Sequence, residues 1–187
     1  MNELYHHGVL GMKWGIRHYQ PYGSGGYSPK NVFISGSSKT QSKDSSYYRK
    51  KLPKPIRKEI NSHIKDGNKI LVGDAPGIDR QVQDYLNKKK YSNVEVYGPG
   101  KQVRYQANKN WKAHPIDASE YIEMSSEWLA KKDIEMTNQS TEGLAIILDE
   151  GSKATRNNIQ RLIDQNKDVK VFELSKDGKS KDHWVRG

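Results

Sequence analysis

The feature that most constrains the fold is a regular alternation of short apolar runs and amphipathic segments between residues 31 and 174. The apolar runs are β-branched and of strand length, at 31–36, 69–73, 93–98, 143–149 and 169–174. Apolar residues recur at helical spacing between them, over 54–66, 78–89, 119–137 and part of 150–167. Strands that alternate with helices of this length form right-handed βαβ units. We therefore predict an α/β fold, a three-layer Rossmann-like sandwich with a mainly parallel sheet of about five strands.

Residues 1–31 differ in composition from the rest of the chain. They are rich in glycine, tyrosine and histidine and end in the linker-like stretch GSGGYSP. We expect an extended N-terminal segment over 1–31, one domain over 32–174 and a polar tail over 175–187. The hydrophobic fraction of 33% and the mean hydropathy of -0.98 agree with part of the chain lying outside the core.

The chain has no cysteine, which excludes disulfides and cysteine-based metal sites. No apolar run is long enough to span a bilayer, and the N-terminus lacks the apolar stretch of a secretory signal. We therefore expect a soluble intracellular protein with no membrane partner. The adjacent His6 and His7 point in different directions and have no third ligand at suitable spacing, so no metal and no cofactor are expected.

The formal net charge is +10, and basic residues concentrate in 39–58 and 101–112. Such patches either keep a surface solvated or attract an anionic partner, such as a nucleotide, a nucleic acid or an acidic protein. The sequence has no aromatic-rich RNA-binding signature and no helix-turn-helix pattern. Nucleic acid is therefore the least favoured of these partners.

Three predicted turns between a strand and a helix combine small residues with charged ones. The carboxyl ends of parallel strands meet at one edge of a sheet, so we expect these turns to line one site. Glycine lets the backbone approach a ligand, and the N–H groups at a helix N-terminus attract anions. The candidates are Gly36, Ser37, Ser38 and Lys39, then Gly73, Asp74, Gly77 and Asp79, and then Gly151, Ser152, Thr155 and Arg156.

These candidates also have a purely structural interpretation. Asp79 in the first turn of a helix would complement the helix dipole, and Ser152 or Thr155 would be an ordinary N-cap. The chain contains neither the P-loop pattern nor the G-x-G-x-x-G pattern of dinucleotide-binding folds. The spacing alone leaves both interpretations open.

Four stretches follow one another along the chain: VFISGSSK, LVGDAPGIDRQVQDYL, KKDIEMTNQSTEGLAIILDEGSKATRNNIQRLI and KDVKVFEL. Together, over 32–174, they resemble the SLOG superfamily and most closely its YspA-like branch. The resemblance implies a Rossmann-like domain that binds a nucleotide or a nucleotide-derived ligand. It adds Asp133 to the candidate site residues. The chain departs from the family pattern at Lys132, where an arginine is usual, at Ala154, where a glycine is usual, and around Ser38 and Lys39, where an arginine is common.

Some SLOG relatives are phosphoribohydrolases with a P-G-G-x-G-T-x-x-E loop whose glutamate is thought to act on the ribose. The corresponding stretch here is DEGSKATRNNI, in which Asn158 stands where that acid would fall. General acid–base chemistry needs a titratable group within reach of the bond that breaks. The departure therefore favours binding over turnover, although Asp74, Asp79 or Glu150 could substitute.

The stretch LYHHGVLGMKWGIRHYQPYG has a resemblance of its own. It is similar to a short segment, H-x-G-I-L-G-M-K-W-G-V-R-R-Y-Q, that is attached to varied proteins of tailed phages. The resemblance implies a phage or prophage protein, located in the host cytoplasm or in the virion. Met12, Trp14 and Ile16 could anchor such a segment on a phage structural protein, or they could pack on their own domain.

These observations order four hypotheses. The first is a module that binds a nucleotide-derived ligand and sequesters a host defence signal. The second is an enzyme, a hydrolase that cleaves an N-glycosidic or phosphate bond in such a nucleotide. The sequence leaves open whether the protein is a binder or an enzyme. The third is a virion-associated assembly protein, and the fourth is a nucleic-acid binder.

Because SLOG relatives often dimerise, a homo-oligomer is expected. We also expect Gly77→Val or Thr155→Glu to abolish ligand binding and to leave the fold largely intact.

Overall fold

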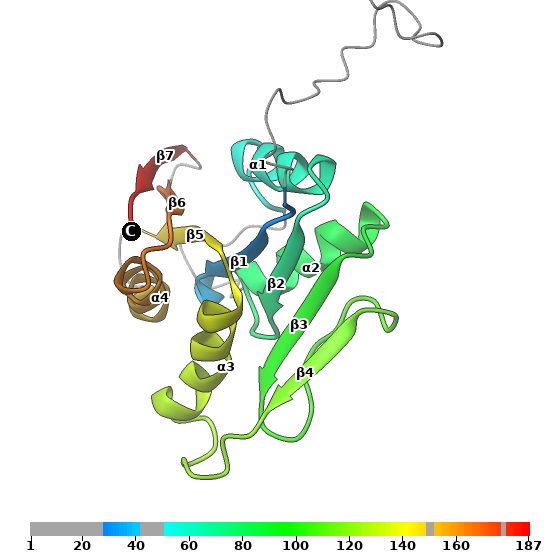
Figure 1. The fold of residues 1–187 in the computed structure, drawn as a ribbon, viewed down its shortest axis with the longest axis vertical. Coiled ribbons are helices and arrows are strands. Elements are labelled where there is room, and N and C mark those ends of the chain that lie inside the picture. Colours follow the sequence, from blue (N-terminus) through cyan, green and yellow to red (C-terminus); the bar gives the residue numbers. More distant parts are fainter. Residues whose placement is uncertain (1–27, 42–50, 149–151, 177–178) are drawn as a thin grey trace, which may run out of the picture.

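The alternating segments form one seven-stranded sheet with the strand order β4-β3-β2-β1-β5-β6-β7 (Figure 1). The computed structural model describes residues 28–41, 51–148, 152–176 and 179–187. Every pair of neighbouring strands is parallel except β6 and β7, which are antiparallel. The strands are β1 (Asn31–Gly36), β2 (Lys69–Gly73), β3 (Val94–Pro99), β4 (Lys112–Ile116), β5 (Glu142–Leu148), β6 (Val169–Leu174) and β7 (Ser180–Val185).

Helices cover both faces of the sheet, as the three-layer prediction requires. On one face, Ile60 and Val82 from two helices pack against Ile34 of β1. On the other face, Met136 and Leu162 from the two remaining helices pack with β-strand residues such as Phe33. The helices are α1 (Lys54–Lys65) and α2 (Ile78–Lys88) on the first face, and α3 (Ser126–Gln139) and α4 (Lys153–Asp164) on the second. The predicted Rossmann-like α/β sandwich is therefore confirmed.

Strand order reverses next to β1, which pairs with β2 on one side and with β5 on the other. Both β1 and β5 are central, and β5 is buried along its whole length. In open parallel sheets, ligands bind beyond the carboxyl ends of the strands where the order reverses. The turns that follow β1, β2 and β5 lie at this point.

The sheet has two strands more than the five that the sequence predicts, and both are at its edges. β4 lies between the predicted strand at 93–98 and the predicted helix at 119–137, where no strand is predicted, and β7 lies within the expected polar tail. Most residues of both strands are exposed or half-buried, so neither has an apolar run to reveal it. Backbone pairing with β3 and with β6 defines these strands instead.

Helix α3 begins at Ser126, later than the predicted start at residue 119. The Ser125 side chain accepts a hydrogen bond from the backbone N–H of Trp128 at 3.1 Å and caps the helix there. Residues 1–27, with the expected phage-type segment and its anchors, lie outside the described residues. The boundary near residue 31 and the docking role of that segment therefore stay predictions.

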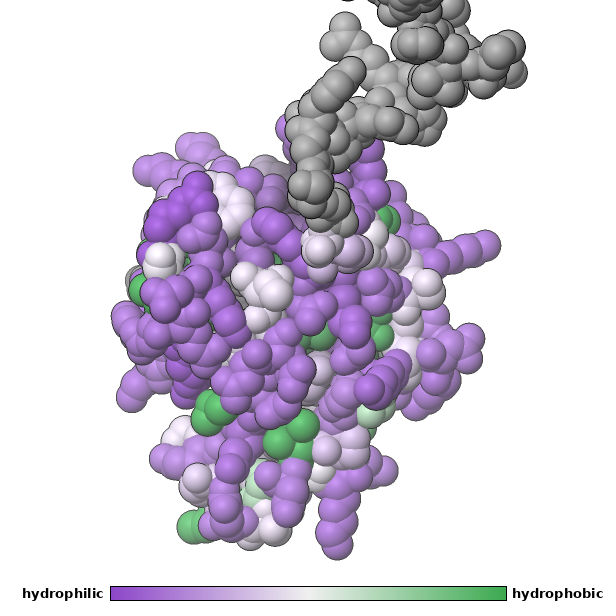
Figure 2. Space-filling model, viewed as in Figure 1, coloured by the Kyte–Doolittle hydropathy of each residue, from purple (hydrophilic) through white to green (hydrophobic). Residues whose placement is uncertain are grey.

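The surface on the side seen in Figure 2 is mainly hydrophilic, with hydrophobic residues in small separate patches. This agrees with the mean hydropathy of -0.98. Within the described ranges, no helix combines the length and the apolar character needed to cross a membrane.

Candidate functional site

A cavity of about 410 Å³, here called the central cavity, is lined by the turns after β1, β2 and β5. Ser38 comes from the first turn, Pro76 from the second and Ala154 from the third, while Leu129 of α3 completes the wall. The predicted site residues that line it are Gly36, Ser37, Ser38, Lys39, Asp79, Asp133, Ser152 and Thr155. Turns that are far apart in the sequence therefore meet around one space at the reversal of strand order.

The glycines of the second turn allow close packing rather than exposing backbone to the cavity. Gly77 has φ +91°, and a Cβ placed on it would lie 2.3 Å from the carbonyl oxygen of Ser37. The next residue, Ile78, donates its backbone N–H to that same carbonyl at 3.1 Å. A Cβ on Gly73 would lie 2.3 Å from Oδ2 of Asp79. Gly77 and Gly73 are not among the residues that line the cavity, but they set its shape.

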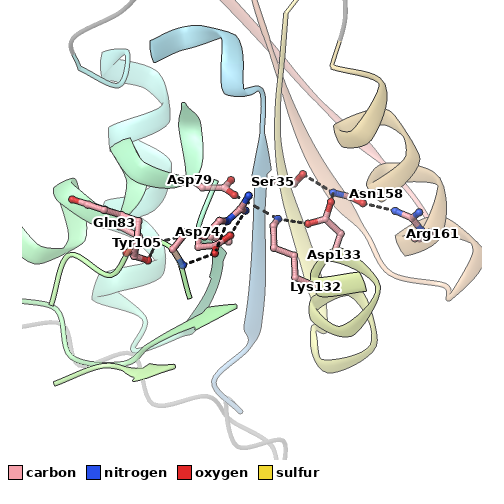
Figure 3. Close-up of polar contacts among 11 residues, drawn as sticks. Ser35, Asp74, Asp79, Gln83, Tyr105, Lys132, Asp133, Asn158 and Arg161 are labelled. Atoms are coloured by element: carbon pink, nitrogen blue, oxygen red, sulfur yellow. Dashed lines mark hydrogen bonds and ion pairs between the residues drawn. The ribbon is translucent and has the colours of Figure 1, made fainter. Parts of the chain in front are cut away.

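A chain of buried polar contacts forms the floor of the central cavity (Figure 3). Lys132 of α3 forms ion pairs with Asp133, its neighbour, and with Asp79 of α2, the latter at 3.7 Å. Lys132 is almost completely buried, as are both carboxylates. The three groups connect α2 on one face of the sheet to α3 on the other, past the carboxyl end of β1.

Asn158 of α4 extends this chain. Its amide nitrogen donates to Oδ2 of Asp133 at 3.0 Å and to Oγ of Ser35 at 2.9 Å, and its amide oxygen accepts from Arg161 at 2.6 Å. Asn158 is buried and is not among the residues that line the central cavity. A glutamate here would put a second carboxylate against Asp133, so the amide is needed as a donor.

The electrostatics of the floor raise two pKa values. Burial raises the pKa of Asp79 to about 6 despite the opposing charge of Lys132, and the nearby carboxylate of Asp133 adds to the rise. Burial by itself would lower the pKa of Lys132, but the carboxylates of Asp133 and Asp79 raise it above its ordinary value. The floor therefore holds a fixed positive charge next to a carboxyl group that titrates close to neutrality.

Asp74 lies beneath the cavity wall instead of in it. Its Oδ2 accepts from the backbone N–H of Arg104 at 2.8 Å and from the side-chain Nε at 2.9 Å, and Oδ1 is paired with a terminal nitrogen of the same guanidinium. The hydrogen bond to Asp74 raises the pKa of Arg104. Asp74 is therefore engaged by the protein, and Arg104 is the residue of this pair that lines the cavity.

The third turn contributes hydroxyl groups and the start of α4. Ser152 has the left-handed backbone conformation, with φ 61°, and its side chain makes no capping hydrogen bond to the helix. Its Oγ instead accepts from the backbone N–H of Leu148 at 3.3 Å. Thr155 is buried and lines the cavity, whereas Arg156 is exposed and is not among the lining residues. Gly151 lies outside the described residues.

Sequence reasoning missed several residues of this site. Lys132 is noted only as a departure from a family pattern, and Arg104 only as part of a basic loop, yet both line the central cavity. Lys153, at the first position of α4, lines it as well. The positions of these three residues depend on how α3, α4 and the loop after β3 pack around the cavity. No local pattern of residues reveals that packing.

Comparisons with known proteins add no assignment: no protein-family model matches the chain, and no curated protein matches it either. The SLOG resemblance therefore stays a prediction that rests on its four motifs. Among the residues that the structure describes, no group of three or more His, Asp or Glu side chains is arranged to hold a metal ion.

Proposed function

We propose that the protein binds a nucleotide-derived ligand and holds a phosphate group of that ligand in the central cavity. The observation that carries the proposal is the set of cations around one space: Lys39, Lys132, Lys153 and Arg104 all line it. Asp79 and Asp133 are paired with Lys132, and Asp74 is paired with Arg104, so the cations that remain for a ligand are Lys39 and Lys153. Lys39 and Lys153 are exposed and carry their charges to the cavity rim.

Neutral donors at the same cavity support the proposal. Lys153, Ala154 and Thr155 form the first turn of α4, where backbone N–H groups lack partners within the helix. Such N–H groups bind anions, and the helix dipole adds to the attraction. Hydroxyl groups from two separate turns, those of Ser37, Ser38, Ser152 and Thr155, line the same space. A phosphate oxygen accepts from all of these groups.

The surroundings of Asn158 favour capture of the ligand over turnover. This residue occupies the position of the acid in the resembling hydrolase loop, and its amide is held by Ser35, Asp133 and Arg161. An amide neither gains nor loses a proton near neutral pH, so Asn158 cannot act as a general acid or base. Together with the phage-type segment, this supports a role in which the protein sequesters a host signalling nucleotide.

Calorimetric titration and thermal unfolding test the proposal directly. The panel contains AMP, ADP, ADP-ribose, cyclic AMP and cyclic ADP-ribose, with inorganic phosphate as the reference. At least one nucleotide should bind more tightly than phosphate and raise the unfolding temperature, because a ligand that binds only the folded state stabilises it. If no member of the panel binds, the proposal is contradicted.

Hydrolysis of the ligand is a second candidate function, and the position of Asp79 favours it. Asp79 lines the central cavity, and burial raises its pKa to about 6, close to the value that suits an acid–base group at neutral pH. Incubation of each nucleotide with the protein, followed by chromatography, separates the two functions. Unchanged nucleotide supports capture, whereas products that disappear in Asp79→Asn support hydrolysis.

A further inference from the structure

A second cavity, of about 800 Å³ and here called the side cavity, lies next to the central cavity. Two residues, Arg104 and Met124, line both cavities. The rest of the side cavity comes from the end of β3 and the loop after it, from β4, from the segment between β4 and α3, and from Trp128 of α3. A ligand held in the central cavity therefore has an adjoining space into which it can extend.

The walls of the side cavity are suited to a flat aromatic group. Tyr121 and Met124 line it with 39% and 60% of their surfaces exposed, although large apolar side chains are usually buried. Lys131 Nζ lies 5.3 Å from the centre of the Tyr121 ring and steadies that ring. Trp128, which is only 7% exposed, forms a rigid wall against Gly100. Aromatic rings of this kind stack on nucleic-acid bases.

The charges of the side cavity differ from those of the central cavity. Two exposed carboxylates, those of Asp117 and Glu123, line it together with the exposed Lys101. Carboxylates repel a second phosphate group, but they accept hydrogen bonds from amino groups, as they do from the amino group of cytosine. Arg104 marks the boundary between the two cavities, with its guanidinium 5.7 Å from the centre of the Trp128 ring and fixed by Asp74.

Resting on the proposed function, we infer that the side cavity binds the base of the same nucleotide and selects bases that carry an exocyclic amino group. The phosphate lies in the central cavity among the cations, and the sugar passes Arg104. The base then stacks on Tyr121 and gives its amino N–H groups to Glu123 or Asp117. Phosphate and base thus occupy two adjoining spaces, and the exposed carboxylates that can accept from an amino group line the space of the base.

Calorimetric titration with three probes tests this inference: AMP, inosine 5′-monophosphate, which lacks the amino group, and ribose 5-phosphate, which lacks the base. AMP should bind at least about tenfold more tightly than either of the others, given the usual strength of base stacking and of a charged hydrogen bond. Tyr121→Ala should weaken AMP by about tenfold and leave ribose 5-phosphate unchanged. Tyr121→Phe, which keeps the ring, should bind AMP like the wild type.

The control is Trp184→Ala, which removes an exposed aromatic ring from β7, outside the lining of both cavities. It should bind all three probes like the wild type. Equal affinity for AMP and ribose 5-phosphate, or equal weakening of both by Tyr121→Ala, overturns the position of the base. Equal affinity for AMP and inosine 5′-monophosphate overturns the selection for an amino group. If none of the three probes binds, this inference fails, whereas the proposed function fails only if no nucleotide of the wider panel binds either.

Discussion

The carboxylate of Asp74 binds both the backbone N–H and the guanidinium of Arg104, a residue 30 positions further along the chain. Asp74 follows β2 directly and is buried, whereas Arg104 belongs to the loop between β3 and β4. Gly98 near the end of β3 leaves room for this contact, since a Cβ there would lie 2.4 Å from Oδ2 of Asp74. The pair thereby fixes the boundary between the central and side cavities.

Asp74→Ala should lower the free energy of unfolding by about 2 kcal/mol, because it removes a buried carboxylate that accepts charge-assisted hydrogen bonds from Arg104, whose exposed guanidinium then returns to water. Urea unfolding followed by circular dichroism measures the change. The matched control is Asp84→Ala, whose exposed carboxylate accepts from the hydroxyl of Tyr105 in the same loop. The control should cost less than about 1 kcal/mol. Equal effects of the two substitutions would contradict the anchoring role of Asp74.

Gly77→Ala should destabilise the fold by about 2 to 4 kcal/mol, since it combines a positive φ with a clash against backbone atoms. The new Cβ would lie 2.3 Å from Ser37 O and 2.4 Å from Ser38 Cα, neither of which can move freely. Gly67→Ala is the matched control, with φ +71° and no atom within 4 Å of its Cβ, and should cost about 1 kcal/mol. Thermal and urea unfolding of both variants separate two costs. Gly67→Ala reports the cost of a positive φ alone, and Gly77→Ala adds the cost of the clash with backbone atoms.

This geometry is at odds with the expectation that Gly77→Val leaves the fold largely intact. A valine at this position meets the same backbone atoms as an alanine, with two further methyl groups. Loss of ligand binding in that variant would therefore report loss of structure as readily as loss of the site. Substitutions at exposed residues that line the cavity are the better probes.

The sequence predicts the central strands of the sheet well because buried strands consist of recognisable apolar runs. β1, β2 and β6 have the predicted bounds, since their buried residues form continuous or alternating apolar runs. The edge strands have no such apolar run. β4 is the stretch KAHPI, in which two residues are half-buried and the other three are exposed. Edge strands are specified by backbone pairing with a neighbour, which depends on the folded sheet rather than on composition.

The candidate site is predictable only in part, for a related physical reason. Turns between strands and helices are visible as glycine and small polar residues, and Ser38 and Thr155 do line one cavity. The burial of Lys132 cannot be read from its neighbours, because a lysine next to an aspartate is ordinarily an exposed surface pair. The charge of Lys132 is tolerated in the interior because Asp79 approaches it from α2 while Asp133 pairs with it from α3.

Asp79 should make stability depend on pH in a direction opposite to that of most carboxylates. Burial raises its pKa from the ordinary 3.8 to about 6, so the folded protein keeps a proton that the unfolded chain has already lost. The resulting stabilisation is fully present below about pH 4 and is lost as the pH rises through about 6. A shift of this size corresponds to about 3 kcal/mol.

Asp79→Asn cannot titrate and should lack this dependence. Between pH 4 and pH 7, the free energy of unfolding of the variant should rise by about 3 kcal/mol relative to that of the wild type. Urea unfolding at half-unit steps of pH measures the difference, in which titrations common to both proteins cancel. Asp164→Asn, on an exposed position of α4, should follow the wild-type profile. Parallel profiles for Asp79→Asn and the wild type would contradict the raised pKa.

Lys39→Glu should weaken the binding of AMP about tenfold or more without loss of stability. Lys39 is exposed, follows β1 and lines the central cavity, so the substitution replaces an attraction for phosphate by a repulsion. The control is Lys88→Glu, which makes the same change of net charge. Lys88 is exposed and is the last residue of α2, whose first turn lies at the cavity, so this substitution should change affinity less than about twofold. Titrations at low and high salt add a second criterion for the position of the phosphate.

Salt should reduce the difference in AMP affinity between the wild type and Lys39→Glu, because it screens an exposed charge. If the two variants weaken AMP equally, the effect belongs to the overall positive charge of the protein, and the phosphate does not lie beside Lys39.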